Sequence, residues 1–170
     1  MSGAFATFYT YSCNGNFSAN LARIALPMAF MEWDNSYYTG VDIFDEEHKK
    51  LVAIINDLNA AQEAGCEKTE LEFICARLVE YTALHFRHEE MYFAQCDYPE
   101  AEEHKGFHDA LKAAVFAFRD RVQLENCPSV AEELAQFLRR WYHVHILVED
   151  AKYARHLKEH AHLYARRPEL

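Results

Sequence analysis

The stretch HFRHEEMYF at residues 85–93 places His85 and Glu89 four positions apart. His104 and His108 repeat the same spacing with two histidines. Residues at positions i and i+4 lie on one face of a helix, so each pair presents two donor atoms side by side. Imidazole and carboxylate groups in such an arrangement could bind a metal ion. Other parts of the chain supply three further candidates: His48, His145 and Asp150.

The elements that would position these donors are four helices, predicted from apolar residues spaced three and four apart. The first begins at Asp42, with Asp42 or Asp45 as its cap, and ends before Gly65. The second begins at Thr69, where Glu72 three residues later completes a capping box, and stops near Asp97.

The third helix has Pro99 in its first turn, where a missing N–H group costs nothing. A capping box of Ser129 and Glu132 begins the fourth. Its inward face is predicted to carry Leu134, Leu138, Trp141, His145 and Val148.

Short connections between these helices make neighbours antiparallel, and the sequence therefore predicts an all-α fold, an up-down-up-down four-helix bundle. His48 is near the start of the first helix, and His85 is near the end of the second. The third helix starts, and the fourth ends, at the same level. Seven donors should therefore meet at one end of the core: His48, His85, Glu89, His104, His108, His145 and Asp150.

Buried carboxylates without partners would cost on the order of several kcal/mol each, and metal cations would offset that cost. A donor set rich in imidazole suits iron, zinc or copper better than magnesium or calcium. Two octahedral ions offer twelve coordination positions, of which the histidines, two bridging carboxylates and one bridging oxygen would take eleven. A single open position suits a small diatomic ligand.

From about Trp33 to Tyr153 the chain resembles the hemerythrin family, in particular the bacterial hemerythrins. The segments that carry the resemblance are WDNSY (33–37), DEEHKKL (45–51), HFRHEE (85–90), YPEAEEHKGFH (98–108) and WYHVHILVEDAKY (141–153). All seven donor positions of the family are filled, in order. The resemblance implies a four-helix bundle that holds a non-haem di-iron centre and binds O2 reversibly.

The resemblance also implies a role for each donor. His104, His108 and His145 would hold one iron, and His48 and His85 the other. Glu89 and Asp150 would bridge the two ions together with a hydroxide, and O2 would bind at the open position of the iron held by His48 and His85. The protein would store O2 or deliver it to an oxygen-consuming enzyme.

Tyr142 departs from the family, which usually has leucine three residues before the last ligand histidine. Its hydroxyl could hydrogen-bond a ligand in the O2 pocket, or admit water and speed oxidation. Alternatively, Tyr142 is an aromatic filler whose hydroxyl is turned away.

Two other classes of function stay open. One is an O2, redox or NO sensor that acts through a partner protein. The other is a di-iron peroxidase or NO reductase, although carboxylate-rich di-iron oxidases use Glu-x-x-His sites that differ from this histidine-rich set.

The net charge of −10 argues against nucleic acid and anionic membranes as partners. No run of 18 uncharged apolar residues is present, so no membrane span is expected. Five cysteines without a CxxC pair favour reduced thiols and a cytoplasmic location. We expect a monomer.

Three regions are predicted: an N-terminal extension (1–31), a hemerythrin-like bundle (32–155) and a C-terminal tail (156–170). The first has a single charge, Arg23, and we interpret it as a poorly ordered extension or as an upstream start ahead of Met31. From Ala151 the chain is basic and helix-prone, and could continue the fourth helix or turn across its end.

Overall fold

The computed structural model describes residues 30–164, with side chains as far as His160. These residues form helices and no strands. The elements are a 3-10 turn η1 (Asn35–Tyr37), the α-helices α1 (Asp42–Glu63), α2 (Lys68–Cys96), α3 (Ala101–Leu124) and α4 (Cys127–Val144), a π-helical segment η2 (His145–Asp150), and α5 (Ala151–Tyr164).

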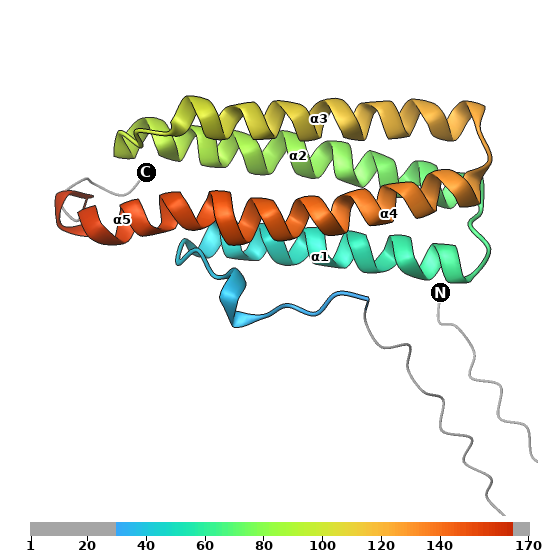
Figure 1. The fold of residues 1–170 in the computed structure, drawn as a ribbon, viewed down its shortest axis with the longest axis horizontal. Helices are drawn as coiled ribbons and strands as arrows, with labels where there is room; N and C mark the ends of the chain where they lie inside the picture. The colour runs from blue at the N-terminus through green and yellow to red at the C-terminus, as the bar shows by residue number, and fades with distance from the viewer. Residues whose placement is uncertain (1–29, 165–170) are drawn as a thin grey trace, which may run out of the picture.

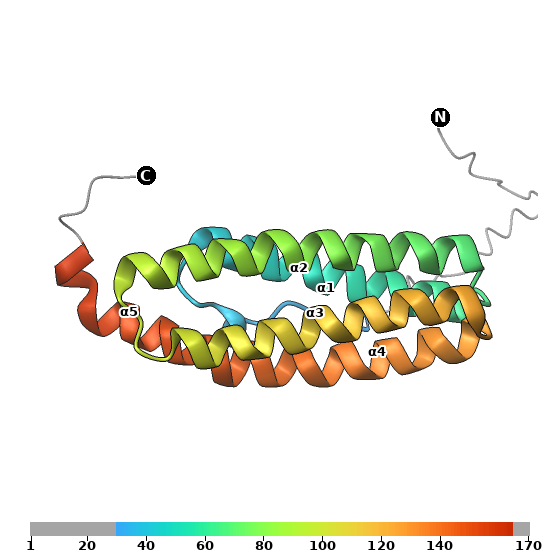
Figure 2. The same cartoon turned by 90° about the horizontal axis from the view of Figure 1, so that it is seen from above.

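The helices form an antiparallel bundle in which α2 packs against α1 and α3, and α4 packs against α1 and α3 (Figures 1 and 2). The elements α4, η2 and α5 make one continuous rod (Figure 1). The predicted all-α, up-down-up-down four-helix bundle is thus confirmed. Among the helices described, none combines the length and the apolar character needed to cross a membrane.

The helix α1 ends in a turn that its sequence favours. Gly65 has φ +101° and its N–H donates to the carbonyl of Gln62, while the N–H of Cys66 donates to Ala61 O at 2.7 Å. This pair of bonds is a Schellman motif, which needs a left-handed residue just past the helix. Gly65 therefore ends the helix as predicted.

The predicted N-terminal caps are wrong. Val41 precedes α1, Glu67 precedes α2 and Asn126 precedes α4, and none of them makes a side-chain capping bond. The Asp45 carboxylate instead accepts from the N–H of Thr39 at 2.7 Å and holds the loop before the helix.

The two capping boxes fail because each helix begins upstream of its box. The carbonyl of Glu67 already accepts from Leu71 N at 3.1 Å, so α2 starts one residue before Thr69. In α4, Pro128 occupies the first turn, where its fixed φ suits a helix, and the helix starts ahead of Ser129. Pro99 lies in the turn that precedes α3, and not in its first turn.

Near the start of the described chain, the backbone is fixed by specific contacts. The N–H and C=O groups of Met31 both bond the Asn56 side chain at 2.8 Å. Residues 1–29 of the predicted extension lie outside the described residues. The segment after Ala151 continues the fourth helix as α5, the first of the two options above.

The core consists of two hydrophobic clusters. The larger cluster runs along the bundle and includes Leu51, Ile55 and Leu58, each at most 1% exposed. The smaller one, at the end where α1 begins, gathers Phe44, Phe93, Cys96, Tyr98 and Tyr153. The histidines and carboxylates singled out above form a polar layer between these clusters.

Candidate metal centre

All seven predicted donors come together in this polar layer. The start of α1, the end of α2, the start of α3 and the segment η2 contribute them, and each residue is at most 2% exposed. They are His48, His85, Glu89, His104, His108, His145 and Asp150. The convergence expected from the antiparallel arrangement is therefore present in the structure.

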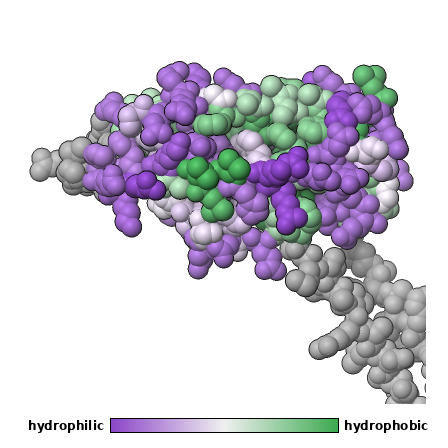
Figure 3. Space-filling model, in the orientation of Figure 1, coloured by the Kyte–Doolittle hydropathy of each residue, from purple (hydrophilic) through white to green (hydrophobic). Residues whose placement is uncertain are grey.

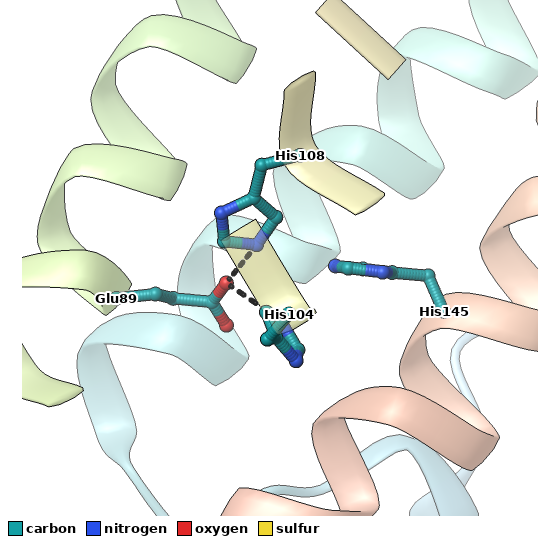
Figure 4. Close-up of side chains that lie close together, drawn as sticks. All are labelled: Glu89, His104, His108 and His145. Carbon is teal, nitrogen blue, oxygen red and sulfur yellow. Dashed lines mark ion pairs between the residues drawn. The ribbon is translucent and has the colours of Figure 1, made fainter. Parts of the chain in front are cut away.

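The donor atoms fall into two groups that share one residue. Glu89, His104, His108 and His145 have donor atoms within 4.8 Å of one another (Figure 4). His48, His85 and the same Glu89 form the second group by the same measure. A residue that belongs to both groups is suited to bridge two ions.

The Glu89 carboxylate divides its two oxygens between the groups. Its Oε2 lies 3.0 Å from His108 Nε2 and 3.7 Å from His104 Nε2, the contacts drawn in Figure 4. Its Oε1 lies 3.6 Å from His85 Nε2. One carboxylate therefore faces both groups of histidines.

Asp150 does the same from the opposite side of the core. Its Oδ2 lies 3.2 Å from His48 Nε2. Its Oδ1 lies 3.3 Å from both His104 Nε2 and His145 Nε2. Two carboxylates thus span the space between the two groups.

These contacts are short but are not good hydrogen bonds. Within the described residues, His104 Nε2, His145 Nε2 and both oxygens of Asp150 are buried and lack a hydrogen-bond partner. Buried polar atoms are nearly always paired, so a set of donors aimed at common points, and not at one another, fits bound cations. The imidazole-rich composition of the set fits iron, zinc or copper.

The π-helical segment explains how His145 and Asp150, five residues apart, reach the same site. In an α-helix that spacing turns the second side chain well away from the first, whereas a π-helix bonds i to i+5 and brings both to one face. The predicted inward position of Val148 is wrong for the same reason. Val148 is 50% exposed, and Figure 3 shows an apolar patch over this rod, where Val144 and Leu147 are also exposed.

The outer nitrogens of two histidines bond to glutamates that the sequence analysis missed. Glu47 Oε2 lies 2.9 Å from His85 Nδ1, and Glu90 Oε1 lies 3.1 Å from His108 Nδ1. Such contacts fix the ring orientation and tautomer of a metal-ligating histidine. Their only signal in the sequence is that each glutamate directly adjoins a donor, Glu47 before His48 and Glu90 after Glu89.

Aromatic side chains enclose the donors. Phe86 stacks on His108 with ring centroids 3.9 Å apart, and Trp141 stacks on His145 at 4.2 Å. The Tyr153 hydroxyl, also missed from the sequence, donates to Glu89 Oε1 at 2.6 Å. These contacts hold the rings and the carboxylate in place and exclude water from them.

Without metal, the carboxylates and histidines of the layer shift one another's pKa values. Burial acts to lower the pKa of His104, but the nearby carboxylates of Asp150 and Glu89 outweigh it and raise the pKa to about 9. Burial raises the pKa of Asp150, but His145 and other histidines outweigh it and lower the pKa to about 2. Burial lowers the pKa of His145 to about 3.

The shift at His104 predicts how pH affects the stability of the metal-free protein. A folded-state pKa of about 9, above the ordinary 6.5, stabilises the fold fully below pH 6.5. That contribution is lost as pH rises from 6.5 through about 9. We expect the Tm of the metal-free protein to fall across this window and that of the metal-loaded protein to stay nearly constant, as thermal unfolding monitored by circular dichroism would measure.

Glu47 supports a second prediction, since it is the buried outer partner of His85. Glu47→Ala should lower metal affinity about tenfold, because it leaves a buried ring N–H unpaired and the imidazole free to rotate. Competition with a chromophoric chelator measures the change. The matched control is Glu46→Ala, which removes an exposed glutamate of the same helix that bonds Lys49 and no other described residue. Equal loss in both variants would contradict the assignment.

Tyr142 lies wholly inside the bundle. It is 0% exposed, contacts the ring of Tyr37 edge-on at 5.1 Å, and its hydroxyl has no hydrogen-bond partner in the part of the chain described. Burial, with the charges of Tyr37 and Asp150, raises its pKa far above the ordinary value. Tyr81, which stacks on His85 at 5.0 Å, also has a buried hydroxyl that no described residue satisfies.

Comparisons with known proteins agree with this geometry. A family model described as the hemerythrin HHE cation binding domain matches residues 39–157. A bacteriohemerythrin of Stenotrophomonas maltophilia is 30% identical over 139 residues, which cover 82% of this chain and 89% of that protein. A bacteriohemerythrin of Pseudomonas aeruginosa is 34% identical over 126 residues, 74% of this chain and 80% of that protein.

Solved structures give the same result. The crystal structure of wild-type hemerythrin superimposes with a TM-score of 0.67 at 25% identity. The match covers 76% of this chain and 98% of that one. The likeness therefore extends over the whole bundle.

Proposed function

Because the chain belongs to the hemerythrin family, we propose that it binds O2 reversibly at a centre of two iron ions. His104, His108 and His145 would hold one iron, and His48 and His85 the other. Glu89 and Asp150 would bridge them. When bound, the two ferrous ions supply the electrons that make O2 binding both strong and reversible.

The observation that carries this proposal is the division of each carboxylate between the two histidine groups. Glu89 has its Oε2 at 3.0 Å from His108 and its Oε1 at 3.6 Å from His85. Asp150 has its Oδ2 at 3.2 Å from His48 and its Oδ1 at 3.3 Å from His104. A mononuclear site would not need oxygens directed to both sides. The count of three histidines in one group and two in the other supports an open position on the side of His48 and His85.

The protein's own residues would protect this position. Phe86, Trp141 and Tyr81 stack on ligand rings and keep water out. Exclusion of water slows irreversible oxidation, because the departure of bound O2 in reduced form requires a proton source. Glu47 and Glu90 hold the outer nitrogens of two histidines. Storage of O2, or its delivery to an oxygen-consuming enzyme, is the role we propose.

The test combines metal analysis with reversible oxygenation of one sample. We expect two iron ions per chain, and a visible absorption band that appears when anaerobic ferrous protein meets O2 and disappears under argon over several cycles. A stoichiometry of one metal ion, or a single oxidation without recovery, would overturn the carrier proposal.

A di-iron peroxidase or NO reductase is the second candidate, and one observation favours it. The Tyr142 hydroxyl is buried, has no partner among the described residues, and could donate a proton to a reacting ligand. Repeated consumption of peroxide or NO by the iron-loaded protein, with a reductant present, would support this candidate. A sensor that acts through a partner protein stays a prediction from the sequence.

A further inference from the structure

His88 is a histidine that has no role in the metal centre as described so far. It lies on α2 about one turn after His85, so the two rings are neighbours on the face that packs against α1. The Glu47 carboxylate of α1 reaches between them. Its Oε2 lies 2.9 Å from His85 Nδ1, and its Oε1 lies 2.7 Å from His88 Nδ1. Each oxygen of this carboxylate is therefore held by a different histidine.

The three side chains form a line from the core to the surface. The His85 side chain is 1% exposed, that of Glu47 9% and that of His88 36%. A buried carboxylate oxygen needs a donor, because burial removes the water that would otherwise solvate it. For the inner oxygen this donor is His85. For the outer oxygen it is His88, and no other described residue bonds Glu47 there.

The carboxylate also determines where the protons lie on the two rings. An ionised carboxylate, the ordinary form of glutamate at neutral pH, only accepts hydrogen bonds. The ring nitrogen that faces it must therefore carry the proton. His85 then has its N–H group at Nδ1, and its Nε2 keeps the lone pair that a metal ion needs. The same reasoning places the His88 proton on Nδ1.

Glu90, the outer partner of His108, is held differently. Its side chain is 28% exposed, and its second contact is Lys112 Nζ at 3.6 Å, which is longer than a hydrogen bond. Water can reach Glu90 and solvate it, whereas the buried Glu47 depends on His88. The histidine group with the proposed open position is thus the one whose outer carboxylate has a close protein anchor.

We propose that His88 is a positioning residue of the metal centre: it fixes the Glu47 carboxylate and, through it, the orientation of the His85 ring. The inference rests on the ligand role proposed for His85. His88 does not contact the metal position, because Glu47 lies between. The alternative is that His88 only joins α2 to α1, since its bond to Glu47 links the two helices. The two explanations differ in what a substitution does to a bound ion.

The test measures the affinity of the full-length protein for Co²⁺ by competition with a chromophoric chelator. His88→Leu removes the donor, and affinity should fall roughly three- to tenfold, because loss of a direct outer partner costs about 10- to 100-fold and His88 acts one step further out. His88→Asn should restore most of the affinity, since its amide N–H group can occupy the position of the histidine Nδ1.

The visible spectrum of bound Co²⁺ separates the two explanations, because it depends on the arrangement of the ligands. It should shift in His88→Leu and return in His88→Asn. A contact that only joins the helices would lower the Tm of the metal-free protein and leave both the spectrum and the affinity unchanged. That result would overturn the proposal.

A double-mutant cycle decides whether His88 acts through Glu47. In the Glu47→Ala background, His88→Leu should cause no further loss of Co²⁺ affinity, because two residues in one chain of contacts do not act independently. The matched control is His160→Leu, which should bind Co²⁺ as tightly as the unaltered protein. His160 is a half-buried histidine that bonds a backbone carbonyl of its own helix.

Three other results would also overturn the proposal: no rescue by His88→Asn, the full loss of affinity from His88→Leu when Glu47 is already alanine, or an equal loss in His160→Leu. Binding of Co²⁺ does not involve O2. Failure of reversible oxygenation in the iron-loaded protein would therefore overturn the proposed function and leave this test of His88 unaffected.

Discussion

Replacing Glu89 with alanine should abolish metal binding at both positions of the centre. Glu89 is 0% exposed, and its oxygens face His108 on one side and His85 on the other. Removal of an outer partner such as Glu47 typically weakens a metal site 10- to 100-fold, so loss of a shared ligand should weaken it by more than roughly 100-fold. Iron content measured after dialysis against a weak chelator should fall from the two ions per chain proposed above to nearly none.

Stability should change with the iron. A ligand that binds only the folded state stabilises it by about 3–4 kcal/mol when its concentration is 100 to 1,000 times its Kd. The Glu89→Ala protein should lose this contribution, so iron should no longer raise its Tm. Glu80→Ala is the matched control, because Glu80 is an exposed glutamate of the same helix. Full iron occupancy in the Glu89 variant would show that our ligand assignment is wrong.

The fold and the donor set were largely predictable because both depend on regular helical periodicity. Apolar spacing placed α1 through α4, and spacings of four in α2 and α3 identified the donors there. Short connections then required antiparallel neighbours, which placed the helix ends together. No contact distance was needed for this step, since topology and spacing alone determine which ends meet.

The π-helical segment was not predictable from that periodicity. A donor pair five residues apart, His145 and Asp150, contradicts the α-helical spacing, and the structure resolves this by changing the helix type. A pair of candidate metal ligands at i and i+5 is itself a signal of a π-helical segment, because such segments occur mostly at functional sites. This signal, applied to the sequence, would have predicted that Val148 is exposed to solvent.

Long-range side-chain contacts were also beyond the sequence. Glu47 reaches from α1 to His85 on α2, a pairing that depends on how the helices are rotated about their axes. The start of each helix depended on competition between nearby capping signals, and differences of about 1 kcal/mol decide such competition. At Ser129 the upstream Pro128 prevailed. Sequence patterns of a few residues therefore do not determine at which residue a helix begins.

The Tyr142→Phe variant should speed the release of O2 roughly 10- to 100-fold. We propose that the Tyr142 hydroxyl lines the O2 pocket and donates a hydrogen bond to O2 held there. Hydrogen bonds to a ligand that gains negative charge contribute about 1.5–3 kcal/mol. Stopped-flow displacement of O2 measures the release rate, and Tyr38→Phe, which alters an exposed ring, is the control.

The Tyr142→Phe variant should hold O2 less well, but its ligand-free form should be more stable than that of the unaltered protein. A buried hydroxyl without a partner costs about 1–3 kcal/mol, and the Tyr142 hydroxyl is in this position among the described residues. Its removal should therefore raise the Tm of the ligand-free protein by roughly 2–12 °C. If Tyr142 only fills space, the variant gains stability and O2 release is unchanged. If the hydroxyl instead admits water, oxidation of the ferrous protein slows in the variant. Only the donor role predicts a more stable ligand-free protein together with faster release, because the hydroxyl then has its partner only when O2 is bound.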